Sequence, residues 1–237
     1  MKIFYDVDTQ KDFMNEKGAL YVPDAESIKP NLKLLTDFAR ENFIPVVGSV
    51  DRHFGTEEYK EREGELKVWG GQFPNHCMNE TFGQMKICET RVRKGWQDKS
   101  VCREVEHYLV NNLNKKIDEK SLNQAIKGIM DTNKIIPINY DIHRVYLEKQ
   151  SYDVFTNPNT SELLARAKVN ESVVYGVATD ICVRAAVLGM QKKNIQCYVV
   201  KDAIKGVFPD KTKEALEEMV NAGAKLVTTK EVLEGKI

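Results

Sequence analysis

Residues 173–187 read VVYGVATDICVRAAV, and this stretch joins a run of apolar residues to a pattern of helical spacing. The first five residues are rich in valine and contain a tyrosine, which is typical of a buried strand. After a short turn, Val183, Ala186 and Val187 recur with the period of an amphipathic helix. The stretch therefore predicts a strand, a turn and a helix, with Cys182 where the helix begins.

The same alternation extends along most of the chain. Short apolar runs predict six strands, at 3–7, 44–50, 145–147, 173–177, 197–200 and 225–227. Helical patterns separate them, at about 27–41, 158–168, 181–193 and 210–222. Successive β–α–β units form a parallel sheet with helices on both faces. We therefore predict one three-layer, doubly wound α/β domain over residues 1–237.

One segment, residues 90–142, breaks this alternation because it contains no convincing strand. Apolar residues recur every four positions in its first half, at Val101, Val105, Leu109 and Leu113. Helical spacing continues in its second half, at Leu122, Ile126, Ile129 and Met130. The pattern predicts a helical hairpin inserted into the sheet domain. Its role is left open between a packing or dimerisation element and a lid over the site.

The composition narrows the possible partners. Lys plus Arg number 35 and Asp plus Glu number 35, so the chain has no bulk attraction for nucleic acid or for an anionic membrane. No apolar run approaches the roughly 20 residues of a membrane span, and the start, MKIFYDVD, is acidic where a signal peptide is apolar. The five cysteines form no CxxC motif. We expect a cytoplasmic protein with free thiols and a small-molecule substrate, without nucleic-acid or membrane partners.

Polar residues follow four of the predicted strands. Asp8 follows the first run, Asp51 and His53 end the second, Lys149 follows the third, and Cys182 lies in the turn after the fourth. Each one alone has an ordinary explanation, as a buried thiol or a solvated strand end. The carboxyl ends of parallel strands meet at one edge of an open sheet. Their joint placement therefore predicts a catalytic site there.

Cys182 is the predicted nucleophile. At the start of a helix, unpaired N–H groups and the helix dipole favour a thiolate. Asp8 can accept the thiol proton, and Lys149 can stabilise both negative charges, which gives an activated cysteine without histidine. Asp6 points to the same strand face and is a rival base, but Asp8 lies nearer the strand end.

Asp51 and His53 suggest a metal site. Two positions apart in an extended chain, they project to one face and can bind one ion. His76 is the best third ligand, because His107 and His143 lie in the insertion or at its edge. The alternative is an ordinary strand-end aspartate beside two surface histidines. A mixed set of nitrogen and oxygen ligands suits one divalent ion, with zinc as the first choice and manganese or iron as alternatives.

Three segments resemble the signature stretches of the isochorismatase-like cysteine hydrolases: DTQKDF at 8–13, EKQSYDVF at 148–155 and GVATDICV at 176–183. The residues DRH at 51–53, taken with FPNHC at 73–77, resemble the metal site of the nicotinamidase and pyrazinamidase branch. That branch converts nicotinamide to nicotinate and ammonia in pyridine nucleotide salvage. The resemblance covers most of the chain apart from residues 90–142.

The resemblance implies a role for each matching residue. Cys182 is expected to be the nucleophile, Asp8 the base and later the acid, and Lys149 their electrostatic partner. The backbone N–H groups of Ala178 and Cys182 are expected to form the oxyanion hole, with a cis peptide bond between Val177 and Ala178.

It also implies how the substrate binds. The metal is expected to hold the pyridine nitrogen, while Phe13 and Phe73 form an apolar wall for the ring. Residues 78–83 read MNETFG where the family usually has Gly-Thr-x-Gly, which leaves the substrate open. The alternatives are another small amide, a carbamoyl compound or isochorismate, or a non-catalytic binding protein on the same fold. We also expect a homo-oligomer.

Lys94, in the sequence RVRKG, also resembles the family's Lys-Gly variant and is a rival for the catalytic lysine. Lys149 directly follows a strand-like run and precedes Cys182 by about one βαβ unit of roughly 30 residues. Lys94 lies much farther from Cys182 and has charged neighbours, with no strand-like run before it. Those surroundings favour a solvated surface, so we predict that Lys149 is the catalytic lysine.

Overall fold

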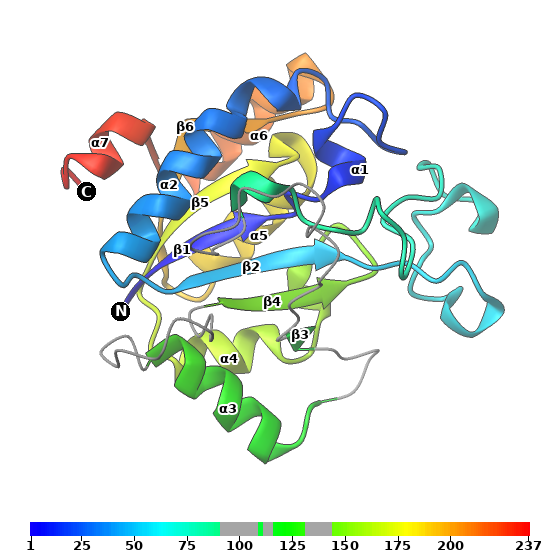
Figure 1. Cartoon of the computed structure of the whole chain (residues 1–237), viewed down its shortest axis with the longest axis horizontal. Coiled ribbons are helices and arrows are strands. Elements are labelled where there is room, and N and C mark those ends of the chain that lie inside the picture. Colours follow the sequence, from blue (N-terminus) through cyan, green and yellow to red (C-terminus); the bar gives the residue numbers. More distant parts are fainter. Residues whose placement is uncertain (91–108, 111–115, 131–143) are drawn as a thin grey trace.

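Seven parallel strands form the sheet in the part of the chain that this computed structural model describes, residues 1–90, 109–110, 116–130 and 144–237. Their order is β3-β4-β2-β1-β5-β6-β7 (Figure 1). The strands are β1 (Lys2–Val7), β2 (Val46–Asp51), β3 (Leu109–Val110), β4 (Arg144–Lys149), β5 (Glu171–Val177), β6 (Gln196–Lys205) and β7 (Lys225–Val227). All six predicted strands are confirmed.

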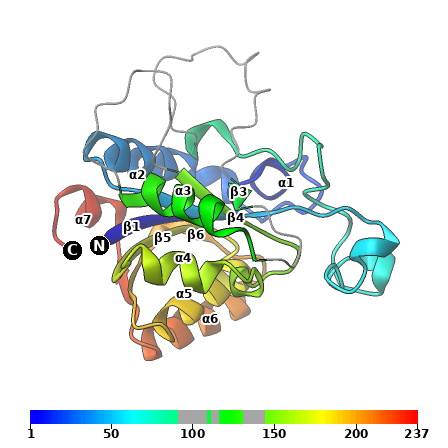
Figure 2. The same ribbon diagram turned by 90° about the horizontal axis from the view of Figure 1, so that it is seen from below.

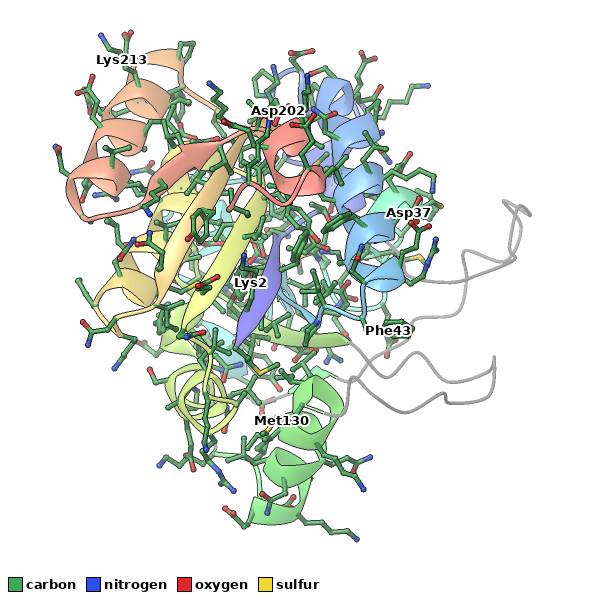
Figure 3. All side chains as sticks on the ribbon, turned by 90° about the vertical axis from the view of Figure 1, so that its left-hand side faces the viewer. Lys2, Asp37, Phe43, Met130, Asp202 and Lys213 are labelled. Atoms are coloured by element: carbon green, nitrogen blue, oxygen red, sulfur yellow. The ribbon has the colours of Figure 1, made fainter. Side chains whose placement is uncertain are left out.

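Helices cover both faces of the sheet. They are α1 (Lys11–Met14), α2 (Lys29–Glu41), α3 (Glu119–Met130), α4 (Thr160–Arg166), α5 (Arg184–Gln191), α6 (Pro209–Asn221) and α7 (Thr229–Leu233). In Figure 2, α2 lies on one side of the sheet and α4, α5 and α6 lie on the other. Figure 3 looks along the sheet from the start of β1 at Lys2, with Asp37 of α2 and Lys213 of α6 on opposite sides. The predicted three-layer, doubly wound α/β fold is confirmed.

The two layers of core follow from the alternation of side chains along the central strand. Ile3, Tyr5 and Val7 of β1 pack into one core with α4, α5 and α6, and Phe4 packs into the other with α2. Successive residues of a strand point to opposite faces, so a strand buried on both faces has a continuous apolar run. The side chains of β1 therefore contribute to both layers of the core.

The path of the chain creates a switch point next to β1. After β1 the chain passes through α2 to β2 on one side, and it later returns to β5 on the other side of β1. Gly176 permits the close contact of β5 with β1, since its φ is +118° and an added Cβ would lie 2.0 Å from the carbonyl oxygen of Val7. Ligand sites of open α/β sheets lie at such a point, beyond the carboxyl ends of the strands.

The insertion differs in part from the sequence prediction. Its second half contains α3 as expected, and Leu122, Ile126 and Ile129 of that helix are buried in the core. The helix predicted through Leu109 is wrong at residues 109–110, which form β3 and pair in parallel with β4. The edge of β4 offers open backbone groups that a short apolar segment can pair with. The remaining calls, including Val101, Val105 and Leu113, lie outside the described residues.

Within the described ranges, no helix combines the length and the apolar character needed to cross a membrane. Cys77, Cys182 and Cys197 are free thiols, in agreement with the expectation from their spacing. Cys102 lies outside the described residues.

The burial of α3 leads to a stability test. Ile129 is fully buried, whereas its neighbour Met130 is half-exposed. Replacing Ile129 by Ala removes buried apolar atoms and leaves a cavity, so we expect the free energy of unfolding to fall by about 2–5 kcal/mol. Met130→Ala is the matched control and should change it by less than about 0.5 kcal/mol. Urea unfolding monitors both; equal, small effects would show that α3 is not part of the cooperative core.

Candidate active site and metal centre

Four neighbouring strands, β4, β2, β1 and β5, bring the predicted site residues to one edge of the sheet. Asp51 ends β2 and Lys149 ends β4, and the register of these two strands pairs the two residues directly. Asp8 follows β1, and Cys182 lies shortly after β5. Because the strands are parallel, all four side chains meet at the carboxyl edge.

The ammonium group of Lys149 contacts the side chains of the other three residues. Its Nζ lies 2.9 Å from Oδ2 of Asp8 and 3.6 Å from Sγ of Cys182, and it donates to Oδ1 of Asp51. Ser49 donates to the other oxygen of Asp8 at 2.7 Å. The side chains of Asp8, Asp51, Lys149 and Cys182 are all buried. The three residues predicted to be catalytic thus share one group of contacts, and Asp51 joins them.

The charges in this group depend on one another. Burial disfavours the Lys149 ammonium, but the negative charges of Asp51 and Asp8 outweigh it and raise the pKa of Lys149 well above its usual value. Burial raises the pKa of Asp8, although Lys149 opposes that shift. The pKa of Asp51 is lowered, because Lys149 and His76 overcome the opposing effect of burial. The lysine is therefore charged and holds a charged Asp51 beside it.

The surroundings of Cys182 differ in part from the sequence expectation. Cys182 lies in a short π-helical turn, Thr179–Val183, and α5 begins only after it. Burial raises the pKa of its thiol well above the usual range, and the nearby Lys149 opposes the shift only in part. The expected cis peptide bond between Val177 and Ala178, at the start of this turn, is confirmed.

The rival residues have other surroundings. Asp6 is buried, and its carboxylate pairs with Lys86 at 2.7 Å and accepts a hydrogen bond from Thr9 at 2.8 Å. These contacts separate it from the group around Lys149. Lys94 lies outside the described residues, so its role stays a prediction.

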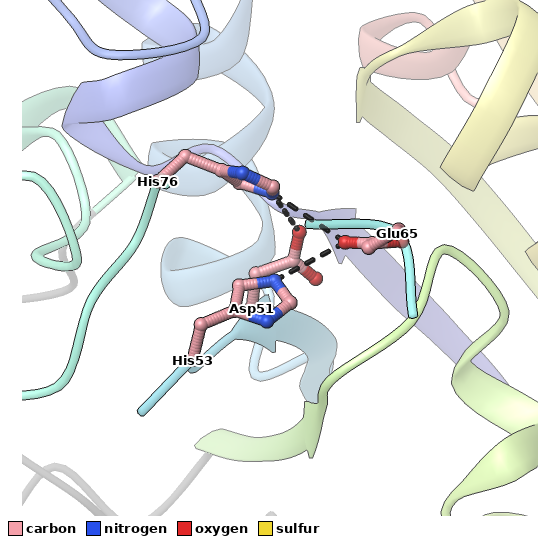
Figure 4. A group of neighbouring side chains, drawn as sticks. All are labelled: Asp51, His53, Glu65 and His76. Atoms are coloured by element: carbon pink, nitrogen blue, oxygen red, sulfur yellow. Dashed lines mark ion pairs between the residues drawn. The ribbon is translucent and has the colours of Figure 1, made fainter. Parts of the chain in front are cut away.

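A second cluster adjoins the first (Figure 4). Asp51, His53, Glu65 and His76 each offer one ligand atom, and these atoms all lie within 4.8 Å of one another. Nε2 of His76 lies 3.5 Å from Oδ2 of Asp51, and Nε2 of His53 lies 3.1 Å from Oε1 of Glu65. The three predicted ligands therefore lie together, and Glu65 is a fourth candidate that sequence reasoning missed.

The signal for Glu65 in the sequence is weak. It stands in an irregular loop between His53 and His76, among several other acidic residues, so no periodicity distinguishes it. The one usable hint is that a carboxylate lying between two candidate ligands can fold back toward both.

The donor set fits a divalent cation. Two imidazoles and two carboxylates are ligands that zinc, manganese and iron accept. Both ring nitrogens of His53 are buried and face carboxylates, with Nε2 toward Glu65 and Nδ1 toward Glu63, as expected for a metal ligand oriented by a second carboxylate. Burial disfavours the charged form of His76, yet Asp51 and Glu65 raise its pKa to about 10. The carboxylates thus favour a positive charge between them.

Neighbouring side chains hold these ligands in place. Glu63 is buried, lies 3.7 Å from Nδ1 of His53, and accepts hydrogen bonds from the N–H groups of Phe54 and Gly55 at 2.5 and 2.8 Å. Gln10 donates to the carbonyl of Asp51 at 2.8 Å and accepts from its N–H at 2.6 Å. Such outer contacts orient metal ligands.

A small pocket of about 30 Å³ joins the two clusters. Phe13 and Phe73, the predicted substrate-binding residues, line it together with Cys182, Asp51 and His76. Ala178, predicted to contribute to the oxyanion hole, lines it as well. Six of the predicted site residues therefore surround one space, and Asp8, Lys149 and His53 lie behind its wall.

The family follows from a comparison of the sequence with known protein families. The isochorismatase domain matches residues 6–231, nearly the whole chain. The chain belongs to the isochorismatase family. Members of this family are hydrolases, so the chain is an isochorismatase-family hydrolase. Among curated proteins, no sequence matches it.

Solved structures share the fold of this isochorismatase-family chain. The pyrazinamidase of Pyrococcus horikoshii, solved in complex with zinc, is 24% identical with a TM-score of 0.66, over 96% of this chain and 98% of that one. The pyrazinamidase/nicotinamidase of Streptococcus mutans is 19% identical with a TM-score of 0.67, over 96% and 100%. The N-carbamoylsarcosine amidase of Thermoplasma acidophilum is 20% identical with a TM-score of 0.63, over 96% of both chains.

The ligand cluster leads to a metal-binding test for this isochorismatase-family protein. His53→Ala, His76→Ala and Glu65→Ala each remove one donor, so we expect each variant to bind zinc at least about tenfold more weakly. Glu58→Ala, an exposed carboxylate in the same loop region, is the control and should keep wild-type affinity. Calorimetric titration and metal analysis after dialysis measure the effect. Full zinc occupancy in the Glu65 variant would remove it from the ligand set.

Proposed function

We propose that this protein hydrolyses nicotinamide to nicotinate and ammonia through a thioester on Cys182. The observation that carries the proposal is the shared contact of Lys149 with Asp8, Asp51 and Cys182. Cys182 lines the same pocket as three residues of the ligand cluster, Asp51, Glu65 and His76. A buried thiol beside an acid and an ammonium group suits nucleophilic attack on an amide. The adjoining imidazoles and carboxylates suit a cation that orients a heteroaromatic ring.

The first chemical step uses the neutral thiol. As Sγ of Cys182 attacks the amide carbon, its proton passes to Asp8, and Lys149 stabilises the negative charge that develops on sulfur. The carbonyl oxygen gains negative charge and is stabilised by the backbone N–H groups of Ala178 and Cys182. Asp8 then returns the proton to the leaving nitrogen, and ammonia departs as the carbon–nitrogen bond breaks. A thioester between Cys182 and the acyl group remains.

Water completes the reaction. Asp8, now a carboxylate again, takes a proton from water as its oxygen attacks the thioester carbon. The carbon–sulfur bond breaks, the acid is released, and the proton returns to Sγ of Cys182. Lys149 stabilises the negative charges of Asp8 and of the departing sulfur throughout this step.

One divalent ion, zinc in the first instance with manganese or iron as alternatives, completes the proposal. Asp51, His53, Glu65 and His76 would hold it, and when bound it supplies a Lewis acid for the ring nitrogen of the substrate. Phe13 and Phe73 would then pack on the ring. A cytoplasmic location, a part in pyridine nucleotide salvage and a homo-oligomeric state belong to the same proposal.

A related amide or carbamoyl compound is the second candidate substrate. The segment 78–83, which departs from the family pattern, lies against the ligand cluster: Met78 forms a bridge with His53, and Asn79 donates to the carbonyl of His53 at 2.7 Å. A changed sequence beside a candidate metal ligand favours a changed substrate. Isochorismate is the weaker alternative, because its hydrolysis needs neither the metal ligands nor a cysteine nucleophile.

The nucleophile is tested with Cys182→Ala in the zinc-loaded protein. Wild-type protein should release ammonia from nicotinamide or pyrazinamide, and the variant should fall to background, because the covalent route is lost while one small side chain is removed. Cys197→Ala, another buried thiol, is the control and should keep its turnover. Circular dichroism checks the fold of both. Substantial turnover by the Cys182 variant would exclude the thioester route.

The lysine is tested with Lys149→Met against Lys94→Met. Loss of the ammonium beside Asp8 and Cys182 removes several kcal/mol of transition-state stabilisation, so kcat/KM should fall by roughly two or more orders of magnitude. The Lys94 variant should remain close to wild type. Rates are measured on protein shown to be folded, since removing one partner of a buried ion pair costs about 3–5 kcal/mol of stability. An inactive Lys94 variant beside an active Lys149 variant would reverse the assignment.

A further inference from the structure

A wide cleft of about 950 Å³ opens next to the pocket at Cys182. Glu65, Phe73, Tyr152 and Ile181 line both spaces, so the small pocket is continuous with the larger cleft. The inner pocket, at about 30 Å³, is much smaller than the cleft. A substrate that is longer than the inner pocket therefore extends into the cleft, whose volume falls in the range of small-molecule sites.

Most ionic groups that line the cleft are already engaged. Arg184 donates to Glu218 at 2.5 Å, and Lys211 donates to Glu214 at 2.8 Å. Asp180 accepts two backbone hydrogen bonds, from the N–H groups of Val207 and Phe208, both at 2.9 Å. Glu65 belongs to the ligand cluster, and Glu61 is exposed to water. None of these groups requires a ligand to satisfy it.

Arg62 is different. Within the described part of the chain its guanidinium makes no hydrogen bond or ion pair, and its Nη1 is shielded from solvent. The neighbouring carboxylate of Glu63 is occupied by the N–H groups of Phe54 and Gly55. Burial accordingly lowers the pKa of Arg62. Because Arg62 lines the cleft, an anionic group that enters it would meet a cation that has no ion pair in the described part of the chain.

The surroundings of Arg62 indicate which acceptor fits. A guanidinium offers parallel N–H donors that match a carboxylate in a two-pronged contact. Tyr152 and Phe208 expose about half of their surface, 51% and 54%, along the same cleft. These aromatic rings suit an apolar spacer between the two ends of a ligand. The cleft thus offers two exposed aromatic rings and the guanidinium of Arg62 to the part of a substrate that extends beyond Cys182.

We propose that Arg62 binds a carboxylate at the far end of the substrate, so that the preferred substrates are small amides with an apolar spacer and a terminal carboxylate. The inference rests on the amide hydrolysis proposed above and names the substrate class of the same site. Arg62 acts here as a specificity-determining residue that contacts the substrate away from the reacting atoms.

The first experiment compares matched amides in the zinc-loaded wild-type protein. The probes are succinamate, glutaramate and adipamate, each against its own methyl ester, which keeps the amide and the spacer but removes the charge. We expect kcat/KM for ammonia release to be at least tenfold higher for the carboxylate member of one or more pairs. Equal values in all three pairs, or no turnover of any carboxylate amide, would overturn the proposal.

The second experiment identifies the residue. Arg62→Gln should raise KM for the preferred carboxylate amide at least tenfold with little change in kcat, because the contact is equal in the ground and transition states. Arg62→Lys keeps the charge but not the planar fork and should recover part of the loss. Lys67→Gln removes an exposed charge nearby that does not line the cleft, and it should match wild type. Identical behaviour of the Arg62 and Lys67 variants would refute the assignment.

Nicotinamide separates this inference from the nicotinamidase proposal, since it has no carboxylate. Turnover of nicotinamide without any preference for carboxylate amides refutes the role of Arg62 alone. A carboxylate preference that depends on Arg62, without turnover of nicotinamide, supports the role of Arg62 and refutes nicotinamide as the substrate.

Discussion

The ammonium group of Lys149 lies buried between two carboxylates, and the arrangement of the central strands depends on this contact. Removing a charge from water is costly unless a partner of opposite sign is close, and losing one partner of a buried pair costs about 3–5 kcal/mol. Asp8 and Asp51 provide these partners. The register of β2 with β4, which pairs Asp51 with Lys149, is therefore fixed by charge as well as by backbone hydrogen bonds. A slip of one residue would turn Lys149 to the opposite face.

Asp51 also links Lys149 to the ligand cluster. One of its oxygens accepts from Lys149, and the other faces His76 in the ligand cluster. A cation bound to Asp51 competes with Lys149 for the same negative charge. The thiol side and the metal side of the pocket are thus coupled through a single carboxylate, and a change on either side alters the electrostatic surroundings of the other.

The sequence predicts the residues whose position follows from regular structure. Four site residues lie at or shortly after the end of a strand: Asp8, Asp51, Lys149 and Cys182. Their meeting could be predicted because parallel strands bring their carboxyl ends together. Glu65 could not be predicted in this way, because its position depends on the path of an irregular loop. The burial of Cys182 could not be predicted either. The turn before a helix is visible in the sequence, but the burial that raises the pKa of the thiol depends on packing from several distant elements.

The sequence predicts that α3 is a helix but does not predict where the helix packs. Its spacing predicts a helix, but nothing in the spacing tells whether the helix stands apart or joins the core. Leu122, Ile126 and Ile129 pack into the core layer that includes β4, and α3 contacts α4 as well. The apolar surface of β4 and α4 is therefore matched to a segment that interrupts the regular β–α alternation. In evolution, such a segment and the surface beneath it have to change together, because a descendant that lost α3 alone would expose a patch prone to aggregation.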